Sequence, residues 1–116
     1  MDAGKSATAT FTKATSINIT VPNGDENRNW RAGTTQTIRW TYTGNPGSYV
    51  RIQLFKNGVL NRTIATRTSI GSGGSGSYNW RIPSNQTTGV DYKVKITSTA
   101  NSSYTDTSDN NFTIGR

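Results

Sequence analysis

The sequence predicts an all-β protein, an antiparallel sandwich of about seven strands. Apolar residues alternate with polar ones in short runs, which is the period of a half-buried strand. Turn residues separate these runs, and twelve glycines outnumber three prolines, so most turns are of the glycine kind. No segment repeats apolar residues at helical spacing. A chain of 116 residues is long enough for one core and one domain.

Three alternating runs lie in the first half of the chain, and each ends at a turn that contains Gly or Pro. They cover residues 16–21, 37–42 and 49–55. The third run alternates most regularly, because its apolar residues Val50, Ile52 and Leu54 share one face while their neighbours share the other. These runs predict three strands, each with one face in the core.

An Asn-Gly pair at 57–58 marks a hairpin after the third run. A two-residue loop would place polar residues opposite Leu54 and Val50, on the core face. We therefore expect a three-residue loop over 56–58 with a bulge, which pairs Leu54 with Leu60.

The second half of the chain contains three further alternating runs. They cover residues 78–82, 92–96 and 112–114. The glycine-rich segment 71–76 offers too few side chains to pack, so we expect a surface loop there. Short strands with turns about every 8–12 residues are typical of an immunoglobulin- or fibronectin-III-like sandwich.

The domain boundaries follow from a change in composition. Residues 1–15 are rich in Ala, Thr and Ser, and we expect a linker that contributes at most one edge strand. Residues 16–116 form the predicted sandwich. The start and end of the chain suggest a domain excised from a longer protein, and no stretch is apolar enough to span a membrane.

A few aromatic residues carry the expected core. In an immunoglobulin-type order the strands that hold Trp40 and Trp80 are neighbours, so we expect the two rings to meet. The motif at 89–92 predicts a tyrosine corner, in which the Tyr92 hydroxyl bonds the backbone a few residues upstream. Trp30 lies outside the alternation, and it either caps the core or offers a stacking surface to a sugar or base.

The order of these motifs resembles one family, the immunoglobulin-like domain of the Ser-Thr-rich, GPI-anchored membrane family. That domain is found in yeast proteins of cell-wall β-glucan assembly and in repeats of bacterial and archaeal surface proteins. The resemblance spans about residues 16–115. It rests on the segments 19–24, 38–44, 78–83 and 89–96, with Trp30 and Gly33 between the first two. It implies a fold and a cell-surface or extracellular location, and it implies no chemical mechanism or lipid anchor.

The residue inventory argues against catalysis. The chain has no His and no Cys, so it contains neither a nucleophile relay of the Ser-His-Asp or Cys-His kind nor an imidazole or thiolate metal site. The six carboxylates form no calcium-binding loop and no convincing glycosidase pair. We expect no enzyme activity, no cofactor and no metal.

The formal charge of +7 raises the question of an anionic partner. The basic residues are dispersed, so we expect no specific nucleic acid, and a solvated surface explains most of the charge. We expect a monomeric structural or adhesive module whose partners are neighbouring domains or a cell-wall polysaccharide. Carbohydrate binding is the alternative function, and polyanion or nucleic-acid binding is the third.

One face is the candidate for such binding. If the apolar residues of runs 49–55 and 92–96 point inward, the residues between them must point outward. These two strands are adjacent in an immunoglobulin-type sandwich, so their outer residues form one surface. The set combines aromatic, cationic and amide groups: Tyr49, Arg51, Gln53, Phe55, Lys93 and Lys95.

Overall fold

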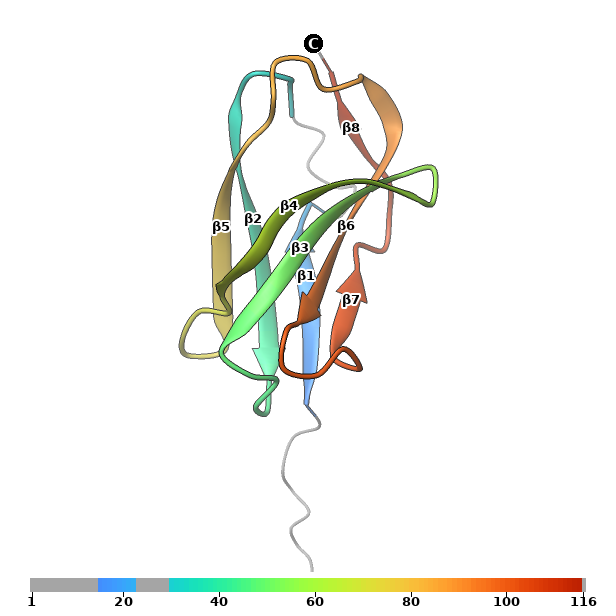
Figure 1. Ribbon diagram of the computed structural model, residues 1–116. Coiled ribbons are helices and arrows are strands. Elements are labelled where there is room, and N and C mark those ends of the chain that lie inside the picture. Colours follow the sequence, from blue (N-terminus) through green and yellow to red (C-terminus); the bar gives the residue numbers. More distant parts are fainter. Residues whose placement is uncertain (1–14, 23–29, 116) are drawn as a thin grey trace, which may run out of the picture.

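The computed structural model describes residues 15–22 and 30–115, and these contain eight strands (Figure 1). They are β1 (Ser16–Val21), β2 (Thr35–Thr43), β3 (Tyr49–Lys56), β4 (Val59–Ser69), β5 (Ser75–Arg81), β6 (Gly89–Ser98), β7 (Thr105–Thr107) and β8 (Phe112–Ile114). The linker predicted for residues 1–15 lies outside the described residues, except for Thr15.

The strands form two antiparallel sheets, as an immunoglobulin-like sandwich requires. One sheet has the order β1, β2, β5. The other has the order β4, β3, β6, and both β7 and β8 pair with the far edge of β6. The predicted fold class is therefore confirmed. The structure has one strand more than predicted, and the additional strand is β7. The alternation pattern does not reveal it because its sequence, Thr-Asp-Thr, has no apolar residue.

The core lies between the sheets and comes from the inner faces of the alternating strands. On the larger sheet Val50, Ile52 and Leu54 of β3 have no exposed surface, and Val94 and Ile96 of β6 are buried as completely. The expectation that these residues point inward is confirmed. Burying side chains of this size contributes about 1.5–3 kcal/mol each, which drives the two sheets together.

The hairpin between β3 and β4 differs from the expectation. Its loop has two residues, Asn57 and Gly58, both with positive φ (53° and 79°), as in a type I′ turn. The expected three-residue loop is wrong. The register between β3 and β4 shifts at three places along the hairpin. As a result, Leu54 lies opposite Arg62 and Ile52 lies opposite Ala65. Bulges instead of a longer loop adjust the register.

Trp40 and Trp80 are both buried, but the expectation that they meet is wrong. The register of β2 and β5 places Trp40 opposite Gly76, and Trp80 lies opposite Gln36, four residues away along β2. A Cβ on Gly76 would lie 2.6 Å from the Trp40 indole nitrogen, so the indole needs this glycine. The same nitrogen donates a hydrogen bond of 2.9 Å to the Ile70 carbonyl. The surface loop predicted for residues 71–76 is therefore too long, because Gly76 belongs to β5.

Trp30 is the ring that meets Trp80. Their ring centroids are 6.3 Å apart, and Trp30 also makes an edge contact with Phe112 of β8 at 5.3 Å. Trp30 is only 4% exposed. It therefore caps one end of the core, and the alternative of an exposed stacking surface is wrong.

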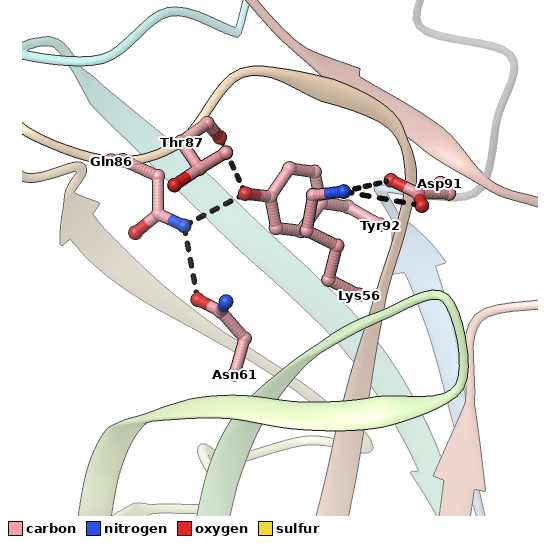
Figure 2. Close-up of polar contacts among 6 residues, drawn as sticks. All are labelled: Lys56, Asn61, Gln86, Thr87, Asp91 and Tyr92. Atoms are coloured by element: carbon pink, nitrogen blue, oxygen red, sulfur yellow. Dashed lines mark hydrogen bonds and ion pairs between the residues drawn. The ribbon is translucent and has the colours of Figure 1, made fainter.

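Tyr92 forms the predicted tyrosine corner (Figure 2). The side chain is fully buried, and its hydroxyl donates to the carbonyl of Thr87, five residues upstream. The hydroxyl also accepts a hydrogen bond of 2.9 Å from the side-chain nitrogen Nε2 of Gln86. The same nitrogen donates a second hydrogen bond of 3.0 Å to the side-chain oxygen of Asn61 in β4. Through the Gln86 side chain, this hydroxyl connects the segment before β6 with the neighbouring β3–β4 hairpin.

Asp106 of β7 joins the two sheets at their open edge. Its carboxylate accepts a hydrogen bond of 2.7 Å from the backbone nitrogen of Ile19 in β1. Burial raises the pKa of this carboxyl and the nearby Asp109 adds to the rise, while the Ile19 and Thr107 amides lower it; the net pKa is raised. The folded state therefore holds the proton more tightly than the unfolded chain does.

Replacing Tyr92 by Phe should lower the free energy of unfolding by about 1–2 kcal/mol with the fold retained, because a buried hydrogen bond is lost while the ring remains. Denaturant unfolding measures this. Tyr104→Phe is the matched control, since Tyr104 packs against the core and its hydroxyl has no hydrogen bond within the described ranges. Equal effects of the two changes would contradict the corner.

Replacing Asp106 by Asn should remove the part of the stability loss that the wild-type protein shows as the pH rises through the pKa of this carboxyl. A raised folded pKa means that the wild-type carboxyl favours folding most when protonated, and that this contribution is lost as the pH rises through its folded pKa. Asn keeps an acceptor for Ile19 without the charge. The free energy of unfolding of Asp106→Asn, relative to wild type, should thus increase between pH 3 and pH 7. A decrease over that interval would show that the charged hydrogen bond outweighs burial.

Candidate ligand-binding face

The six residues singled out from the sequence lie on the outer surface of β3 and β6, here called the β3–β6 face: Tyr49, Arg51, Gln53, Phe55, Lys93 and Lys95. The register between the two strands fixes how they meet. Gln53 lies directly opposite Lys95, and Phe55 lies opposite Lys93. Tyr49 and Arg51 are exposed, while the other four are half-buried.

Phe55, Lys93 and Lys95 surround a hollow of about 310 Å³, whose wall is completed by Gly58 and Thr107. The Lys95 ammonium nitrogen lies 5.9 Å from the centroid of the Phe55 ring. The structure thus brings these three predicted residues together in one concave place. The sequence analysis did not predict Thr107, because this residue belongs to β7, which lacks an alternating pattern. Thr107 lies opposite Lys95 in the pairing of β6 with β7.

Arg51 lies beside this hollow rather than in it. Arg51 lies opposite Thr97, which is two residues after Lys95 on β6. Arg51 is therefore a diagonal neighbour of Lys95, and their Cα atoms are about 7–8 Å apart. The Thr97 hydroxyl forms a hydrogen bond of 2.9 Å with the Thr105 hydroxyl of β7. Arg51 therefore extends the cationic surface along the sheet.

Tyr49 does not join the cluster. It lies six residues from Phe55 along β3, roughly 20 Å away. The guanidinium carbon of Arg67 lies 3.9 Å from the centre of the Tyr49 ring, so one face of the ring is covered. The two aromatic residues of the β3–β6 face therefore do not form one stacking platform.

The face is positively charged and has no carboxylate to balance it within residues 15–22 and 30–115. Asp91, the nearest acid along β6, forms an ion pair of 3.1 Å with Lys56 at the end of β3. Asp106 bonds across to β1, and Asp109 lies in the loop after β7. Arg51, Lys93 and Lys95 make no ion pair with any of these three acids.

A larger hollow, of about 470 Å³, lies over β2 and β5 and reaches the end of β4. Its wall consists mainly of Ser and Thr hydroxyls with the single cation Arg39. It offers no aromatic surface and only one charge, so the β3–β6 face is the better candidate for a ligand despite its smaller hollow.

The described residues were also searched for clusters of metal-ligating side chains and for long apolar helices. No group of three or more His, Cys, Asp or Glu residues comes together in the described ranges. These ranges also contain no helix that is long and apolar enough to cross a membrane. Asp25 and Glu26, which are close in sequence, lie outside the described residues.

The chain was compared with known proteins. A search of curated proteins gave no match, and neither did a search of solved structures. A family model for the Kre9/KNH-like N-terminal Ig-like domain matches residues 22–114, which covers strands β2 to β8. This agrees with the resemblance to the yeast cell-wall glucan assembly proteins, and the family is associated with cell-wall and secreted proteins. The chain therefore belongs to the Kre9/KNH-like N-terminal Ig-like domain family.

Proposed function

We propose that the domain is a non-catalytic structural module of a larger cell-surface or secreted protein, and that it sets the distance between the parts of its chain on either side. One observation carries this proposal. The described chain starts at one pole of the sandwich, at the bottom of Figure 1, and leaves at the other, at the top. A protein that continued in both directions would run through the domain lengthwise.

Hydrogen bonds locate the two ends against β2. Ser16 pairs with Thr43 at the end of β2. Gly115 exchanges backbone hydrogen bonds with Trp30 and Ala32, just before β2 begins. The nine residues of β2 lie between these points, so the ends are roughly 30 Å apart. The aromatic cap of Trp30, Trp80 and Phe112 fixes the second end to the core.

The edge strand β4 favours a monomeric module. β4 forms an outer edge of the larger sheet. It carries Arg62 and Arg67, and its pairing with β3 is irregular at three places. Charged side chains and bulges disfavour edge-to-edge pairing with another sheet. Two copies of the domain should therefore not pair through their β4 edges.

Carbohydrate binding at the β3–β6 face is a second candidate function, favoured by one specific observation. The hollow beside Phe55 combines an aromatic ring with ammonium groups and the Thr107 hydroxyl. Such a combination can stack on a sugar ring while it bonds the substituents of that ring. The two functions are compatible, because the face lies on the side of the sandwich and the chain ends lie at its poles.

Proteins with one, two and three joined copies of residues 15–115 should grow in length by about one domain per copy. The reason is that each copy receives and releases the chain at opposite poles. Small-angle X-ray scattering measures the maximum dimension of each protein, and sedimentation establishes that each is monomeric. A maximum dimension that hardly rises from two to three copies, with the domains folded, would contradict the spacer role.

A further inference from the structure

The cations of the β3–β6 face form a regular array. Lys93 and Lys95 are two residues apart on one face of β6, so their Cα atoms are separated by about 7 Å. Arg51 adds a third charge diagonally across β3. No described carboxylate pairs with any of the three. Like charges at this spacing repel one another, so an anionic ligand that lies between them would relieve the repulsion.

The hollow beside Phe55 limits the size of the ligand that these cations could bind. Its volume of about 310 Å³ is at the lower end of the range for small-molecule sites, so it suits one ring and not a large ligand. Phe55 provides the apolar part of the wall, and Lys93, Lys95 and Thr107 provide donors around it. The Gln53 amide lies directly opposite Lys95 and adds both a donor and an acceptor.

The same features separate a sugar polymer from a nucleic acid. Proteins that bind single-stranded nucleic acid stack successive bases on several aromatic residues. Here the other aromatic residue of the face, Tyr49, is roughly 20 Å from Phe55 and is stacked against Arg67. One aromatic ring, with the Thr107 hydroxyl and two ammonium groups beside it, instead matches one sugar ring with its hydroxyls. The array of cations then favours an acidic sugar over a neutral one.

We propose that the β3–β6 face binds a carboxylated polysaccharide, with one uronic acid ring at the hollow. The ring lies against Phe55, and its carboxylate accepts hydrogen bonds from the ammonium groups of Lys93 and Lys95. Arg51 receives the carboxylate of a neighbouring sugar along the polymer. This proposal rests on the proposed function only in placing the domain outside the cell, where such polymers occur.

Polygalacturonate is the probe, and its methyl-esterified form is the matched neutral ligand, because it keeps the sugar backbone and lacks the charge. Backbone amide shifts followed by NMR should move in β3, β6 and β7 with polygalacturonate and far less with the ester. The affinity should fall as salt is raised, since the contacts are ionic. Equal binding of the ester would overturn the carboxylate proposal and leave neutral carbohydrate binding in place.

Three variants locate the site. Lys93→Gln with Lys95→Gln should weaken binding roughly tenfold or more, as expected when charge-assisted hydrogen bonds are lost. Phe55→Leu keeps apolar bulk but removes the ring, and it should weaken binding while the fold remains intact by circular dichroism. Arg39→Gln is the control, because it removes one cation from the other sheet, and it should change the affinity less than twofold. If Arg39→Gln weakened binding as much as the lysine changes, the attraction would be general and the site would be refuted.

A single-stranded DNA oligonucleotide tests the competing ligand class. Binding that matches polygalacturonate in affinity and in the residues shifted would show a general polyanion surface and refute recognition of a sugar. No shifts with polygalacturonate at millimolar sugar concentration would likewise refute the proposal. The spacer function would survive both results, because it is tested by the length of joined copies.

Discussion

The pairing of β3 with β6 determines both surfaces of the larger sheet. Ile52 and Ile96 lie opposite one another in the core and are completely buried. Because side chains alternate along a strand, the next pair, Gln53 and Lys95, must face outward. A slip of one residue would turn the β6 lysines into the core, at a cost of several kcal/mol for each unpaired charge. The apolar core thus holds the cationic array in place on the outside.

The end of the sandwich where the chain leaves and the open edge between β1 and β7 are fixed by different means. At the pole where the chain leaves, Trp30 packs between Trp80 and Phe112, and Tyr92 packs against the same Phe112 at 6.0 Å. This aromatic group attaches the short strand β8 to the core. At the open edge, one hydrogen bond from Ile19 to Asp106 connects the two sheets. Because the last described strand is packed against the core, the direction in which the chain leaves is set by the fold, which supports the proposed spacer role.

The sequence predicted what depends on alternation and left out what depends on long-range register. The fold class, the inward residues of β3 and β6 and the tyrosine corner each follow from a local pattern. The partner of Trp80 does not, because Trp30 comes from a segment without alternation and reaches Trp80 only through the folded topology. The three irregularities in the pairing of β3 with β4 leave no local mark either. The contribution of Thr107 to the hollow was missed because β7 has no apolar residue.

Cross-strand nuclear Overhauser effects test the central claim most directly, since they report which residues of β3 and β6 are opposite one another. The structure predicts cross-peaks that connect the backbone of Ile52 with that of Ile96 and the backbone of Leu54 with that of Val94. These cross-peaks should be present in the free protein, because the register depends on the core alone. A pattern that instead paired Ile52 with Lys95 or Thr97 would mean that the strands are shifted by one residue, and the arrangement of core and cationic face described above would be wrong.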